Sequence, residues 1–128
     1  MSRVLVSSGS PFEKTVGYSR AVAQEPWCFV SGTTGYDPQT RAMPEDVKDQ
    51  VRNALKVAET ALVQAGFSLR DVVRATYYIT DTAYWDEIGP VLGEVFGDVR
   101  PAATCLVCSL VKPEMKFEVE LTALRRSE

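Results

Sequence analysis

One long amphipathic pattern limits the folds that are open to this chain. Apolar residues recur at three- and four-residue spacing over residues 47–65, and most of the charged residues between them fall on the opposite side. This spacing predicts an amphipathic helix, with the segment Pro44-Glu45-Asp46 in its first turn and Gly66 just after its end. A helix with one apolar side has to pack on another layer, so the rest of the chain must supply that layer.

Alternating side chains predict that this layer is a β-sheet. In residues 116–124 one face is apolar and the other carries Glu118 and Glu120. Residues 72–80 show a similar alternation. Their expected buried face is Val73, Ala75, Tyr77 and Ile79, and the opposite face is Val72, Arg74, Thr76, Tyr78 and Thr80. The other expected strands span residues 3–7, 18–23, 26–31 and 103–110.

A second helix is expected over residues 83–96, with Gly89-Pro90 kinking or restarting it. The order β-β-β-α-β-α-β-β then predicts an α+β fold in one domain, residues 1–128, with two helices on one face of a mixed sheet. The other face would carry Arg74, Thr76, Tyr78, Glu118 and Glu120. Such a half-polar face can meet solvent or the same face of a partner subunit, and both remain open at this point.

Composition excludes several classes of function. The net charge is −3 and no basic run is present, which argues against binding to nucleic acid. No apolar run is long enough for a membrane span, and three cysteines without a secretory segment predict a cytoplasmic protein with reduced thiols. The absence of histidine excludes His-dependent triads and removes the commonest zinc ligand. For Cys105 and Cys108, spaced C-x-x-C, we favour structural thiols over a metal or redox site.

Two segments near the end of the chain carry a family resemblance. They are Arg100-Pro101-Ala102-Ala103-Thr104-Cys105 and Lys116-Phe117-Glu118-Val119-Glu120. Further matching segments precede them in order: Gly17-Tyr18, Val30-Ser31-Gly32, Asp37-Pro38-Gln39-Thr40 and Asp71-Val72-Val73. On these residues almost the whole chain resembles the Rid family, also known as YjgF or reactive-intermediate deaminases.

The resemblance implies a chorismate-mutase-like α+β fold and a homotrimer, in which three sheets pack face to face and small clefts lie between adjacent subunits. Active members of the family hydrolyse imines and enamines such as 2-aminoacrylate to 2-keto acids and ammonia, without cofactor or metal. Carried over by position, the cleft would be lined by Tyr18, Ser31, Gly32, Cys105 and Glu118. The cysteine would contribute mainly its backbone, and the glutamate would position or activate a water molecule.

One position departs from the pattern of the deaminating members. Ala103 stands where they carry the arginine that binds the substrate carboxylate. Losing such a charge-assisted contact at a buried site costs about 2–5 kcal/mol of binding. We therefore expect a divergent member that hydrolyses imines, enamines or related C–N bonds, with weak or no activity on 2-imino acids. Three arginines, Arg20, Arg74 and Arg100, are candidate substitute cations, and Arg74 is the first to test.

Two other functions remain as alternatives. A non-catalytic trimer that binds a metabolite or regulates a partner would use the same cleft without turnover. Ribonuclease activity, which is attributed to some members of the family, ranks last because the chain has neither histidine nor a basic patch. Without the resemblance, Glu118 would be interpreted as a solvated carboxylate on an amphipathic strand.

Overall fold

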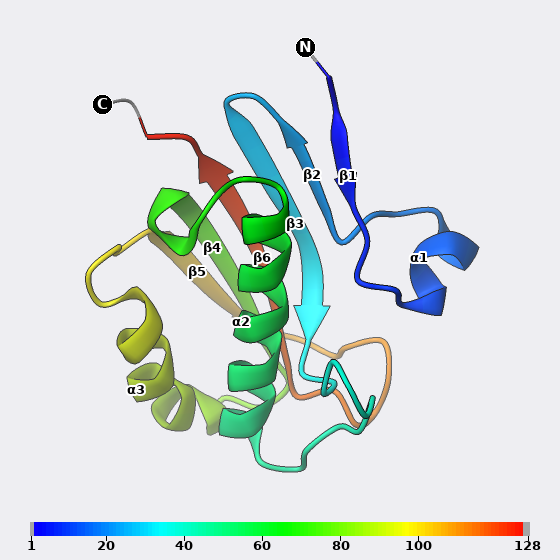
Figure 1. The fold of residues 1–128 in the computed structure, drawn as a ribbon. Helices are drawn as coiled ribbons and strands as arrows, with labels where there is room; N and C mark the ends of the chain where they lie inside the picture. The colour runs from blue at the N-terminus through cyan, green and yellow to red at the C-terminus, as the bar shows by residue number, and fades with distance from the viewer. Residues whose placement is uncertain (1, 127–128) are drawn as a thin grey trace.

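The computed structural model of the chain, which describes residues 2–126, contains one mixed six-stranded sheet (Figure 1). The strands lie side by side in the order β1-β2-β3-β6-β4-β5, and only the pair β4–β5 is parallel. Their bounds are β1 Val4–Val6, β2 Ala21–Gln24, β3 Trp27–Thr34, β4 Val72–Ile79, β5 Ala102–Val107 and β6 Phe117–Leu124. The last strand therefore lies in the middle of the sheet, whereas β5 forms an edge.

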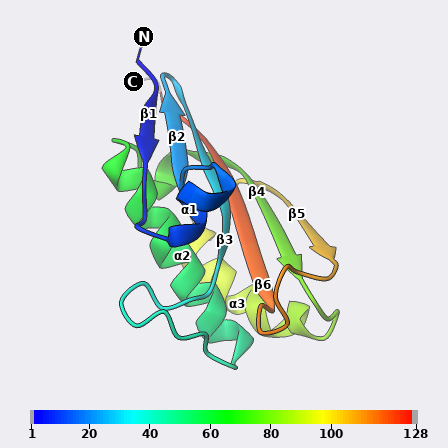
Figure 2. The same ribbon diagram turned by 90° about the vertical axis from the view of Figure 1, so that its right-hand side faces the viewer.

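Two helices cover one face of this sheet, α2 (Val47–Gln64) and α3 (Tyr84–Phe96), as Figures 1 and 2 show. Asp46 caps α2, because its side chain accepts a hydrogen bond from the backbone N–H of Lys48 at 2.8 Å. The predicted α+β class, with two helices on one face of a mixed sheet, is thus confirmed. None of the helices in residues 2–126 is long and apolar enough to span a membrane.

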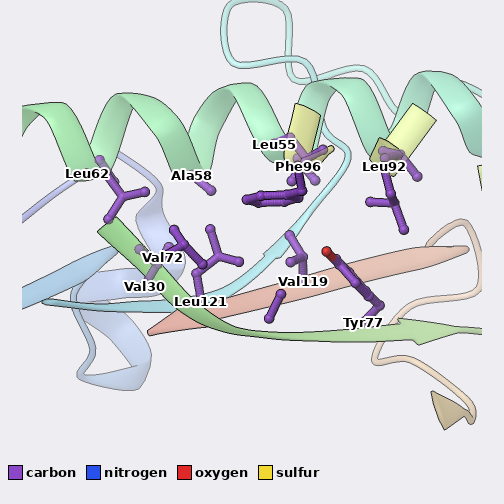
Figure 3. Packing of buried hydrophobic residues seen from close by; sticks show 14 of the residues in the cluster. Val30, Leu55, Ala58, Leu62, Val72, Tyr77, Leu92, Phe96, Val119 and Leu121 are labelled. Carbon is purple, nitrogen blue, oxygen red and sulfur yellow. The ribbon is translucent and has the colours of Figure 1, made fainter. Parts of the chain in front are cut away.

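The core lies between these helices and the sheet. Leu62 of α2 points toward Val72 and Val30 of the sheet, and Leu92 of α3 points toward Tyr77 (Figure 3). Full burial of a side chain of this size contributes about 1.5–3 kcal/mol relative to an exposed one. The alternation expected in the last strand is present, since Phe117, Val119, Leu121 and Ala123 are all buried.

A short first helix, α1 (Pro11–Val16), was not expected from the sequence. Ser10 caps it by accepting a hydrogen bond from the N–H of Phe12, Pro11 occupies its first position, and Gly17 follows it at φ 90°. These end signals are present in the sequence, but six residues are too few to show a helical period. The helix lies beside the β1 edge of the sheet (Figure 1).

Several strand boundaries also differ from the expectation. β3 runs on to Thr34 instead of ending at Ser31, because its register against β6 shifts between Val30 and Thr33. A second shift, near the start of β4, buries Val72 and leaves Val73 exposed, the reverse of the predicted order. β5 ends at Val107, three residues early, and α3 continues through Gly89-Pro90 as one element.

The buried side chain of Gln50 fixes the approach to β6. Its Nε2 donates to the carbonyl oxygens of Pro44, at 2.7 Å, and Glu114, at 3.1 Å, and its Oε1 accepts from the N–H of Lys116 at 2.9 Å. Gln50 is 0% exposed, so these backbone groups would otherwise lie near the core without a partner. The side chain thereby ties α2 to the turn that leads into β6.

Candidate functional site

Glu118 lies on the face of the sheet that the helices leave open. It stands in β6 between Thr34 of β3 and Tyr78 of β4, and its neighbours Phe117 and Val119 point the other way into the core. The residue is half-buried. Within residues 2–126 its carboxylate receives no hydrogen bond, so both oxygens are available to water or a ligand.

Gly32 lies directly beneath this carboxylate. A Cβ atom at position 32 would come within 3.0 Å of the carboxyl carbon of Glu118 and would overlap Oε2. Ser31 is next to it, and its hydroxyl donates to the carbonyl of Ser19 at 2.6 Å. The ring of Tyr18, which is on the same segment as Ser19, has the guanidinium carbon of Arg20 at 5.3 Å from its centroid. We call Tyr18, Ser31, Gly32 and Glu118 the Glu118 cluster.

The environment of Glu118 favours its protonated form. Burial and the neighbouring charge of Glu120 raise the pKa of Glu118, whereas the charge of Arg20 opposes them and does not fully offset them. Glu120 itself accepts a hydrogen bond from the hydroxyl of Tyr78. That bond and the burial around it raise the pKa of Tyr78 to about 12, so Tyr78 remains a neutral donor near Glu118.

Ala103 and Cys105 lie elsewhere in the same chain. On β5 they pair with Ala75 and Tyr77 of β4, whose side chains are buried on the face that the helices cover. Register partners on adjacent strands share a face, so Ala103 and Cys105 lie on the face opposite Glu118, at the sheet edge. One chain thus brings four of the six predicted site residues together and separates the other two.

The two arginines near this sheet edge, Arg74 and Arg100, also lie in different places relative to Ala103. Arg74 pairs with Ala102, so it lies on the open face and is not brought to Ala103 within one chain. Arg100 instead lines, together with Ala103, a hollow of about 590 Å³ between α3 and β5, which is bounded also by Tyr77, Leu92 and Phe96. Whether Arg74 replaces the missing arginine in an assembly stays a prediction.

Comparison with known proteins gives the family of the chain. The Endoribonuclease L-PSP family, the one to which YjgF and the Rid proteins belong, matches residues 9–125. The chain is a member of the Rid family. A RutC family protein of Pyrococcus horikoshii is 31% identical over 127 residues, which cover 98% of this chain and 99% of that protein. Escherichia coli TdcF, named as a candidate reactive intermediate deaminase, is 32% identical over 76% of this chain and 78% of its own length.

Solved structures of the family share the fold. A member of the YjgF/YER057c/UK114 family from Mycobacterium tuberculosis superimposes with a TM-score of 0.87, at 44% identity, over 96% of this chain and 99% of that one. A crystal structure of E. coli TdcF with bound serine superimposes with a TM-score of 0.82, at 28% identity, over 95% of this chain and 94% of TdcF. The chorismate-mutase-like Rid fold expected from the resemblance is therefore confirmed.

Cys105 has the environment of a structural thiol in this Rid protein, and the described residues form no metal site. Cys105 is half-buried, and burial together with nearby Cys108 raises its pKa, which suits a packing thiol better than a nucleophile. Within residues 2–126, no cluster of three or more Cys, Asp or Glu side chains is arranged to bind a metal ion.

Arg20, which contacts both Tyr18 and Gly32, was not among the predicted site residues. The sequence indicated it only as one of three candidate substitute cations, near Tyr18.

Proposed function

We propose that this Rid protein hydrolyses imines, or the enamines that tautomerise to them, in clefts between the subunits of a homotrimer. The observation that carries the proposal is the Glu118 carboxylate, half-buried above Gly32 with a raised pKa and no hydrogen-bond partner in residues 2–126. A carboxyl group whose pKa is raised above its usual range is a stronger base for taking a proton from water. The bound serine in the solved TdcF structure supports a small polar metabolite as the ligand class.

In the proposed reaction Glu118 carries each proton transfer between the water oxygen and the nitrogen. The carboxylate takes a proton from a water molecule as the water oxygen bonds to the imine carbon, and the C=N bond becomes a single bond. The carboxylic acid returns that proton to the nitrogen, which gives a carbinolamine. The carboxylate then takes the proton of the new hydroxyl group and passes it to the amine nitrogen, as the C=O bond forms and the C–N bond breaks, and the products are a carbonyl compound and ammonia. The water molecule and the imine supply every atom of both products.

The separation of the site residues supports the trimer. Ala103 and Cys105 lie on a sheet edge and on the opposite face from the Glu118 cluster, so a cleft with both parts needs two chains. The open face also leaves apolar area for a partner to cover. Trp27 and Phe29 stack on it with ring centroids 6.1 Å apart, and Phe29 is 49% exposed.

Substrate preference follows from Ala103, which has no donor for a carboxylate. We expect faster hydrolysis of the neutral amide of 2-iminobutanoate than of 2-iminobutanoate itself, both generated enzymatically and followed by ammonia release. Glu118→Gln should abolish both activities, and Glu59→Gln, an exposed glutamate on α2, is the matched control. Sedimentation should give a trimer. Preferential hydrolysis of the free acid would contradict the assigned preference, and ligand binding without turnover would favour the non-catalytic alternative.

A further inference from the structure

Arg20 is a charged side chain buried beside the Glu118 cluster. It is 7% exposed, and burial of a charge in a protein is costly unless the charge is paired. Its Nη1 donates to the carbonyl of Gly32 and to Oγ1 of Thr33, both at 2.9 Å. Its Nε lies 3.8 Å from Oε2 of Glu13 and has no hydrogen-bond acceptor within residues 2–126. Every one of these groups belongs to a segment that borders the cluster.

The counter-charge comes from α1. Glu13 is also 7% exposed, and its carboxylate accepts hydrogen bonds from the hydroxyl and the N–H of Ser8. Burial alone would raise the pKa of Glu13, but the bonds from Ser8 and Ser7 and the charge of Arg20 outweigh it and lower the pKa. Glu13 therefore stays ionised and holds Arg20 in place. This gives the short first helix a role in the site.

Arg20 supports the irregular part of β3. Its two hydrogen bonds end on Gly32 and Thr33, where the register between β3 and β6 shifts. A bulge leaves backbone groups without ladder partners, and here the guanidinium supplies a donor to one of them. The same bulge places Gly32, without a Cβ, beneath the carboxylate of Glu118.

We propose that Arg20 is the positioning residue for Glu118: it holds the Gly32 bulge beneath the carboxylate, and its buried charge stabilises the ionised form. The other titratable groups that face Glu118 are Glu120, on its own strand, and Tyr78 on β4. Glu120 opposes ionisation, and Tyr78 binds Glu120, so Arg20 supplies the favourable charge. The inference rests on the proposed function only for the catalytic use of Glu118.

The test measures the proton affinity of Glu118 directly, by ¹³C NMR titration of labelled carboxyl groups in the full chain, with Glu118→Gln to assign the signal. In the Arg20→Gln variant, the carboxylate of Glu118 should bind its proton about tenfold more tightly than it does in the wild-type protein. Arg20→Lys keeps the charge without the paired donors. It should preserve most of the proton affinity and speed amide exchange at Thr33. Arg3→Gln, an exposed arginine that contacts Gln24, is the matched control.

A second variant should change the proton affinity of Glu118 in the opposite direction. Glu13→Gln removes the counter-charge and leaves Arg20 less neutralised, so Glu118 should bind its proton less tightly. This variant decides the question if Arg20→Gln fails to fold. The inference would be overturned if the titration of Glu118 were unchanged in the folded Arg20→Gln variant. It would also be overturned if Glu118 bound its proton more tightly in the Glu13→Gln variant than in the wild-type protein. Because the titration needs no substrate, absent turnover would contradict the proposed function and leave this inference standing.

Discussion

Replacing Ala103 by arginine should create activity on 2-imino acids. The side chain at position 103 is exposed and borders a hollow of about 590 Å³, so a guanidinium can enter without displacing the core. A paired, charge-assisted contact to a carboxylate at this partly open site is worth about 2–4 kcal/mol. At about 1.4 kcal/mol per factor of ten, this corresponds to a gain of about 30- to 700-fold in kcat/KM.

The assay compares 2-iminobutanoate with its neutral amide, using wild type, Ala103→Arg and Ala103→Gln. The gain should be confined to the free acid and to the arginine variant, because glutamine supplies an uncharged amide donor and no guanidinium. The amide should show little change, since it presents no carboxylate to the new group. An equal gain for the amide, or the same gain from Ala103→Gln, would refute a role for the guanidinium in carboxylate binding.

Three further predictions concern stability and the environment of single residues. Gln50→Met should lower the free energy of unfolding by about 2–4 kcal/mol in urea titrations, because a buried donor and acceptor that serve three backbone groups are lost. Glu118→Gln should stabilise the protein at about pH 7 and not at about pH 4. The sign follows because a raised pKa makes the folded state favour the protonated carboxyl, so stability is lost as pH rises through that pKa. Buried Cys28, whose pKa burial raises to about 11, should resist a thiol reagent until unfolding, while exposed Cys108 reacts at once.

The sequence was sufficient for the main elements of the fold because the long segments carry clear periods. The apolar period of residues 47–65 gave α2, and the alternation around Glu118 assigned it to the open face of β6. The irregular parts of the fold could not be predicted from the sequence in the same way. Ser31-Gly32 has the composition of a strand end, but the strand continues through a bulge that depends on a hydrogen bond from Arg20. That contact joins residues twelve positions apart and leaves no periodic signal.

The candidate site was only partly accessible from the sequence. The family resemblance supplied the positions of its residues, but not the face on which each one lies. Placing Ala103 opposite Glu118 requires the parallel register of β5 against β4, which pairs Ala103 with the buried Ala75. The same register separates Arg74 from Ala103 and leaves Arg100 as the arginine that lines the hollow beside it.

In the proposed trimer, the position of β5 at the edge of the sheet would link catalysis to protein concentration. Its two site residues point away from the Glu118 cluster of their own chain, so in the proposed trimer each chain completes a neighbour's cleft and never its own. Dilution below the dissociation constant of the trimer would then remove activity while each subunit stayed folded. The amount of protein present, and not only its substrate, would set the rate per molecule.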